Sequence, residues 1–167
     1  MAVIEHATRR VRILGVTPRP TGQWVTQLGR DLVMDLQDAG TAARFLIRDR
    51  DAKFTAALDA VLADAGVHII KSGVRMPRMN SIMERRIQTC RRELLDRTLI
   101  WNQRHLLYAL REFETFYNEH RPHRALRQAA PLRPLSDPDI DLASITSFDV
   151  RRRDRLGGVL KEYRHVA

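Results

Sequence analysis

Residues 44–70 read RFLIRDRDAKFTAALDAVLADAGVHII, with two short apolar runs on either side of a helical pattern. The first run, 44–47, is predicted to be a buried strand that ends in charged residues. Apolar residues then recur at helical spacing over 55–65, and a second short strand is predicted over 67–70. A strand, a helix and another strand in this order predict a parallel crossover unit, and therefore an α/β fold.

Asp49 comes directly after the first strand of this unit. Side chains at the carboxyl ends of parallel strands gather in one crevice, so Asp49 is predicted to lie there. Farther along, a helix is predicted over 81–97, with one apolar stripe facing the core and a polar strip along its margin. The stripe contains Met83, Ile87, Cys90 and Leu94, and the strip contains Glu84, Gln88 and Arg91.

Four further regular segments are predicted from the same signals. Residues 3–6 and 9–17 have the pattern of two hairpin strands, and Thr21 is placed to cap a helix over 22–38. Another helix is predicted over 103–119, with its apolar residues inward.

The C-terminal part, 136–167, differs in composition from the rest. It begins with prolines and acids without any period, which is typical of a linker. The basic stretch 151–160 that follows is interpreted either as an edge strand or as an unstructured basic arm.

The composition favours a polyanionic partner. The chain of 167 residues has 29 Lys and Arg against 20 Asp and Glu, for a net charge of +9 and a pI near 10.9. It contains no apolar run long enough to span a membrane, and its single cysteine, Cys90, excludes an internal disulfide. We expect a cytoplasmic, nucleoid-associated protein that contacts no membrane.

Asp49 and Glu84 are the candidate metal ligands. Carboxylates that a fold brings together suit hard divalent cations such as Mg²⁺ or Mn²⁺, which keep several waters for substrate phosphates. Chemistry of this kind points to phosphoryl transfer on a nucleic acid. Spacing alone leaves open that both are ordinary solvated surface charges.

Three segments in order carry a family resemblance: 45–54, 77–85 and 117–126, the last reading YNEHRPHRAL. They resemble the second and third acidic motifs and the closing motif of the integrase catalytic core, as found in transposases of bacterial insertion sequences. The resemblance extends over about 3–135. It implies a ribonuclease-H-like fold, with a mixed sheet flanked by helices, and metal-dependent DNA strand cleavage and transfer.

The resemblance also implies residue roles. Asp49 corresponds to the second catalytic acid and Glu84 to the third, both as metal ligands. Positions equivalent to Gln88 and Arg91 point toward DNA in relatives, and a solvated helix margin is the alternative. Other basic candidates for DNA or solvent contact are Lys53, Arg85, Arg86 and Arg92.

The family's first catalytic acid has no good match in this sequence. Glu5 belongs to the predicted hairpin, and the acids of the helix over 22–38 do not fit. We therefore expect a partial catalytic core over 1–135 that lacks its first strand, inactive alone unless an intact transposase or another polypeptide completes it. A homo-oligomer is also expected. The alternative is a non-catalytic, nonspecific DNA-binding remnant that interferes with an intact transposase.

Overall fold

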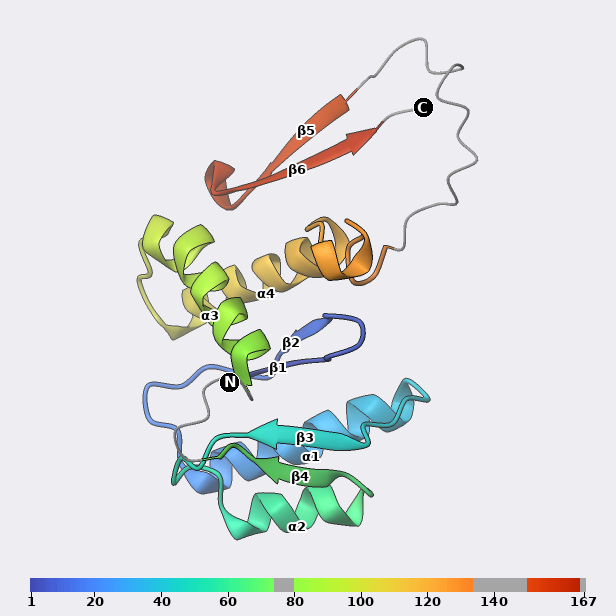
Figure 1. Cartoon of the computed structure of the whole chain (residues 1–167). Helices are drawn as coiled ribbons and strands as arrows, with labels where there is room; N and C mark the ends of the chain where they lie inside the picture. The colour runs from blue at the N-terminus through green and yellow to red at the C-terminus, as the bar shows by residue number, and fades with distance from the viewer. Residues whose placement is uncertain (74–79, 134–149, 166–167) are drawn as a thin grey trace. The chain divides into compact units, whose positions relative to one another are not determined.

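The computed structural model describes residues 1–73, 80–133 and 150–165. Over these residues the protein is mixed α/β, and its strands pair as three two-stranded sheets (Figure 1). The mixed sheet predicted from the sequence is therefore present as separate strand pairs in the described part of the chain.

The chain divides into two compact units. The first contains Met1 and residues 14–85, and the second contains residues 2–13 and 86–167. The boundary near residue 85 falls inside a helix, α3 (Ser81–Glu93).

The first unit contains the predicted crossover. Its strands β3 and β4 pair in parallel, with Phe45 opposite His68 and Arg48 opposite Lys71. Thr21 caps the first helix, because its side chain accepts a hydrogen bond from the backbone N–H of Trp24 at 3.2 Å. The elements in chain order are α1 (Gly22–Asp38), β3 (Phe45–Arg48), α2 (Ala56–Asp64) and β4 (His68–Lys71).

A small core joins the two helices of this unit. Val25 of α1 packs with Leu58 and Leu62 of α2, all nearly inaccessible to solvent. Gly29 permits this close approach, since a Cβ atom there would collide with the Leu58 side chain. The prediction of a buried first strand is wrong at Phe45, which is 51% exposed, because its ring lies beside that of His68 and outside the small core.

The second unit begins with the predicted N-terminal hairpin, in which Ile4 lies opposite Val11.

The helix predicted over 81–97 is interrupted, because Leu94 leaves the helical conformation at φ −120° and a short 3-10 turn, Leu95–Arg97, follows. The other regular elements are β1 (Ala2–Ile4), β2 (Val11–Ile13), α4 (Gln103–Glu119), β5 (Val150–Arg155) and β6 (Leu160–His165).

The basic C-terminal stretch forms an antiparallel hairpin, so the strand interpretation holds and the unstructured arm does not. In this hairpin β5 pairs with β6 from Val150 to Arg155. The predicted linker over 136–149, the proposed domain boundary before it and residues 77–79 of the third acidic motif lie outside the described residues.

The core of the second unit lies against α4. Phe113 and Tyr117 of this helix are buried with Val11 of β2, Leu94 and Leu160 of β6. Elements from both ends of the chain therefore share one hydrophobic cluster.

Asn118 connects α4 to β2 by two buried hydrogen bonds. Its side-chain N–H donates to the Val11 carbonyl at 2.8 Å, and its side-chain oxygen accepts from the Val11 N–H at 2.9 Å. These are the backbone groups through which a further strand would pair with β2. The Asn118 side chain, which is only 4% exposed, thus provides hydrogen bonds for the backbone groups at the open edge of β2 inside the core.

Within the described ranges, none of the helices combines the length and apolar character needed to cross a membrane.

Replacing Asn118 with Ala is predicted to lower the free energy of unfolding by about 2–4 kcal/mol, because it leaves a buried N–H and a buried C=O unpaired. Urea denaturation followed by circular dichroism measures the change. Asn102→Ala is the matched control, since Asn102 only caps α4 at an exposed site and its loss costs about 1 kcal/mol. Equal losses in the two variants would contradict the role assigned to Asn118.

Candidate functional site

Arg48 fixes the backbone around Asp49 at the end of β3. The Arg48 side chain is buried and donates to both carboxylate oxygens of Asp59 on α2, at 2.7 and 2.8 Å. It also donates to the backbone carbonyl of Asp49 at 2.9 Å. The carboxyl end of β3 is therefore held to α2 by a charged pair.

The Asp59 carboxylate is ionised in this arrangement. Burial alone would raise the pKa of Asp59, but hydrogen bonds from Arg48 and Lys71 outweigh that effect and lower it. Lys71 closes β4 and lies 3.4 Å from the same carboxylate. Arg48 at the end of β3, Lys71 at the end of β4 and Asp59 of α2 thus form one ionic cluster. Through Arg48, this cluster holds the Asp49 backbone.

Asn80 connects the Asp49 carboxylate to the start of α3. Its side-chain N–H donates to Asp49 Oδ1 at 3.2 Å. Glu84 lies four positions farther along, in the first turn of α3. Asp49 and Glu84 are both exposed at this end of the helix.

The neighbouring Asp51 has a partner of its own. It forms an ion pair with Lys53, and hydrogen bonds from Lys53 lower the pKa of the Asp51 carboxyl. Lys53 also lies 5.0 Å from the ring of Phe54, so this DNA-contact candidate already has two local interactions.

The donor set of the site fits a hard cation only in part. Asp49 and Glu84 provide oxygen ligands of the type that Mg²⁺ or Mn²⁺ prefers. Across residues 1–73, 80–133 and 150–165, however, no three His, Cys, Asp or Glu side chains group closely enough to hold a metal ion. A cation held here would keep water at most of its positions.

The predicted DNA contacts on α3 are exposed. Gln88 and Arg91 lie four and seven positions after Glu84, which places them on the same side of the helix. Arg92 Nη2 donates to Gln88 Oε1 at 3.5 Å. Arg85 is exposed as well. Their binding roles remain predictions.

Arg86 does not lie on a phosphate-facing or solvent-exposed surface, which corrects the expectation for this residue. It is 5% exposed, and its guanidinium lies 4.4 Å from the ring centre of Phe113 and 4.0 Å from that of Tyr117. Ile87, expected in the buried stripe, is 59% exposed. The aromatic face of α4 attracts the cation, so Arg86 takes the inward position in line with Cys90 and Leu94.

The buried Arg86 guanidinium is poorly compensated. Its Nε and Nη1 atoms have no hydrogen-bond partner in the part of the chain that the structure describes. Burial lowers the pKa of Arg86, although the side chains of Cys90 and Tyr117 oppose this effect. Aromatic contacts therefore replace the carboxylate that a buried arginine ordinarily needs.

Residues of the closing motif, 117–126, pack against each other and against α3 within the second unit. The Tyr117 ring meets the His123 ring edge-on at 4.7 Å, and Arg121 forms an ion pair with Glu93 of α3. Burial and the nearby charge of Arg121 lower the pKa of His123. Together with the Asn118 contacts, these interactions bind α4 to its neighbours.

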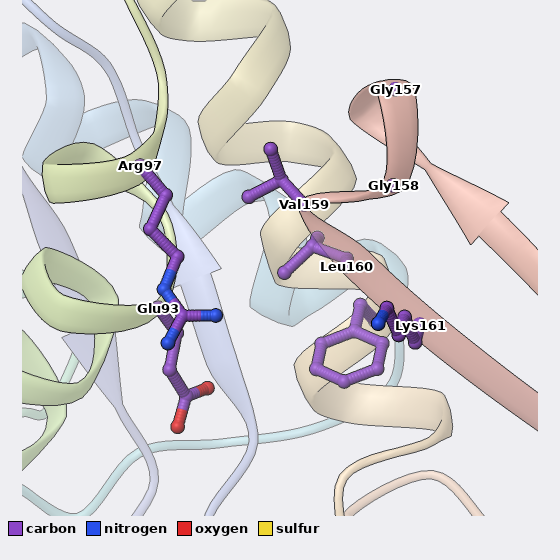
Figure 2. A pocket seen from close by; sticks show the side chains of 8 residues that line it. Glu93, Arg97, Gly157, Gly158, Val159, Leu160 and Lys161 are labelled. Carbon is purple, nitrogen blue, oxygen red and sulfur yellow. The ribbon is translucent and has the colours of Figure 1, made fainter.

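A separate hollow of about 590 Å³ lies within the second unit (Figure 2). None of the predicted site residues lines it. Its walls are Glu93, Arg97, Phe116 and the residues from Gly157 to Lys161 at the turn of the C-terminal hairpin.

Sequence reasoning missed Arg48 and Asn80 as positioning residues. Both lie inside the motifs that carried the resemblance, and Asn80 stands directly before α3 and four positions before Glu84. A polar side chain directly before a helix that carries a candidate ligand is the signal that was available.

Residues 65–131 match the family model described as integrase core domain. The range that is similar to this family model includes Glu84 and the closing motif but not Asp49. No curated protein matches the chain.

Arg86→Met is predicted to raise the free energy of unfolding by about 1 kcal/mol or more, because a flexible apolar side chain fills the same space without a buried charge. Thermal and urea unfolding measure the change. Arg104→Met, at an exposed position of α4, is the control and should shift stability by no more than about 0.5 kcal/mol. A clear loss of stability in Arg86→Met alone would show that the aromatic contacts outweigh the cost of burial.

Proposed function

We propose that this chain functions in DNA transposition, as an integrase-core protein for metal-dependent cleavage and transfer of DNA strands. The observation that carries the proposal is the hydrogen bond between Asn80 and Asp49, which brings the acid after β3 to the helix that carries Glu84. The integrase core match over 65–131 supports it. A ribonuclease-H-like fold is part of the same proposal.

In this proposal Asp49 and Glu84 hold Mg²⁺ or Mn²⁺. When bound, the cation supplies charge stabilisation at the phosphate under attack and lowers the pKa of a bound water or hydroxyl. Asn80 orients the Asp49 carboxylate by donating to one of its oxygens, which leaves the other oxygen available. Arg48 acts as a positioning residue through the backbone of Asp49.

DNA lies along the exposed side of α3 in this proposal. Gln88 and Arg91 follow Glu84 on one side of the helix, where they hold the strand next to the carboxylates. The more general contacts to phosphates come from Lys53, Arg85 and Arg92. A protein with this role works on chromosomal DNA in the cytoplasm.

The two carboxylates are too few for full activity. Asp31 of α1 accepts a hydrogen bond from Gln27, and among the described residues no third candidate ligand groups with Asp49 and Glu84. We therefore propose that strand transfer needs another carboxylate, from a second polypeptide or an intact transposase, in a homo- or mixed oligomer. The alternative, a non-catalytic DNA-binding protein, needs no metal for its action.

Titration with Mn²⁺ tests the site without requiring activity. Weak binding is expected in the full chain, with at least a tenfold loss of affinity in Asp49→Asn and in Glu84→Gln, because each removes a charged ligand. Calorimetry and the Mn²⁺ electron paramagnetic resonance signal provide two readouts.

Asp51→Asn is the matched control, since Asp51 is two residues from Asp49 and is already paired with Lys53. Its Mn²⁺ affinity should stay within about twofold of the parent value. Equal affinity in all four proteins would remove Asp49 and Glu84 from the proposal and favour the non-catalytic alternative.

A further inference from the structure

Three arginine side chains lie near the Tyr117 ring in the second unit. The Arg86 guanidinium lies 4.0 Å from the centre of this ring, and the Arg121 guanidinium lies 5.9 Å from it. The third is Arg9, in the turn between β1 and β2, whose charge acts on Tyr117. The His123 ring meets the Tyr117 ring edge-on at 4.7 Å. We call Arg9, Arg86, Arg121 and His123 the arginine cluster.

The charges of the three arginines act on the same two side chains. Burial lowers the pKa of His123, and the charges of Arg121, Arg86 and Arg9 lower it further. Burial raises the pKa of Tyr117, and the same three charges oppose that rise. The three cations therefore share one neighbourhood.

The positive charge of the cluster exceeds the negative charge beside it. Glu93 forms an ion pair with Arg121, whereas Arg9 and Arg86 form no ion pair within residues 1–73, 80–133 and 150–165. Three guanidinium groups against one carboxylate leave an excess of two positive charges. Like charges repel more strongly where burial keeps water away, so this excess favours a bound anion.

Several nitrogen atoms of the cluster are buried without a partner. Arg86 Nε and Nη1, Arg9 Nη1 and His123 Nε2 are closed off from solvent and make no hydrogen bond to any described residue. The Arg86 side chain that carries two of them belongs to a residue only 5% exposed. An unpaired buried donor is costly, and more so on a charged group, so a ligand that accepts hydrogen bonds here would stabilise the folded chain.

A tetrahedral oxyanion has the chemistry that these groups require. A guanidinium presents its N–H donors as a fork that matches oxyanions, and such charge-assisted hydrogen bonds are strong. A dianion also offsets the whole excess charge of the cluster. Arg9, Arg121 and His123 are only half-buried, so the cluster reaches the surface on their side, and rotation of the long Arg9 and Arg121 side chains admits a small ion.

We propose that the arginine cluster binds one dianionic tetrahedral oxyanion, with the chemistry of phosphate or sulfate. The ion accepts hydrogen bonds from Arg86 and Arg9, and Arg121 and His123 complete the site. The site lies within the second unit and uses neither of the candidate metal ligands, so this inference is independent of the proposed function.

Calorimetric titration of the full chain with sulfate tests the site, with ionic strength held constant by sodium chloride. Arg86→Met should lower the sulfate affinity by about tenfold or more, because it removes a charge and two buried donors. Arg9→Met should lower the affinity as well. Arg9 lies in a hairpin turn and outside the hydrophobic cluster, so this variant decides the result if circular dichroism shows that Arg86→Met does not fold.

Arg104→Met removes the same charge from an exposed position of α4 and serves as the control. Its sulfate affinity should stay within about twofold of the parent value, because exposed charges are screened by salt. Sulfate should raise the unfolding temperature of the parent and of Arg104→Met but not that of Arg86→Met, since a ligand of the folded state stabilises it. The stability advantage expected for Arg86→Met should therefore shrink as sulfate is added.

Two further measurements locate the ion and identify its source. Sulfate should shift the imidazole NMR signals of His123 and leave those of His68, in the first unit, unchanged. Titrations with inorganic phosphate and phenyl phosphate compare a free ion with a phosphoryl group on a larger molecule. Equal affinities would support a site that accepts either source, and binding of inorganic phosphate alone would support a site for the free ion.

Equal sulfate affinity in the parent, Arg86→Met and Arg9→Met would overturn the inference, because binding would then not involve the cluster. A parent chain that sulfate stabilises no more than chloride does at the same ionic strength would overturn it too. Neither result affects the Mn²⁺ titration, which reports on Asp49 and Glu84.

Discussion

The pair of hydrogen bonds between Asn118 and Val11 is the contact on which the second unit depends. β2 has only β1 as a strand neighbour among the described residues, and its other edge meets a helix. A helix backbone has no free groups with which to satisfy a strand edge, because its N–H and C=O groups are used internally. The Asn118 amide provides both a donor and an acceptor at one position, which allows α4 to pack on that edge without unpaired polar groups.

The same contact gives a physical meaning to the closing motif at Tyr117–His123. Tyr117 fills the core next to Val11, and its ring receives Arg86 from one side and the edge of His123 from another. Arg121 ties the end of α4 to Glu93. The residues of this closing motif thus hold the second unit together, while the candidate ligands lie on other segments.

Local patterns predicted most elements of the fold, and nonlocal contacts explain the rest. The helix over 103–119 has the same bounds in the structure, and the parallel pairing of β3 with β4 followed from the crossover rule. The stripe of α3 was predicted with Ile87 inward, because periodicity ranks side chains by hydrophobicity alone. Arg86 points inward instead, because its guanidinium packs on the aromatic rings of α4. This contact is with another helix, so the local pattern of α3 does not predict it.

In the candidate site, too, local sequence predicts some features and nonlocal contacts decide the others. The topological rule predicts Asp49 in a crevice at the carboxyl ends of the strands, because it depends only on strand direction, and this location stays a prediction. It did not predict that Arg48, at the end of an apolar run, would be buried against Asp59 and hold the Asp49 backbone. That arrangement depends on the length of α2 and the phase of Asp59 on it, which composition and spacing do not fix.

The C-terminal hairpin shows why charge alone is a poor guide to structure. In the sequence, Glu162 is one acid in a basic stretch, and its burial follows from the simultaneous presence of Arg155 and His120 around it. A buried carboxylate without such partners would be costly, and separating the hairpin from α4 would break this network. The buried charged groups Arg155, Glu112 and Glu162 therefore hold the hairpin on α4, whereas the exposed arginines of β5 take no part in that attachment.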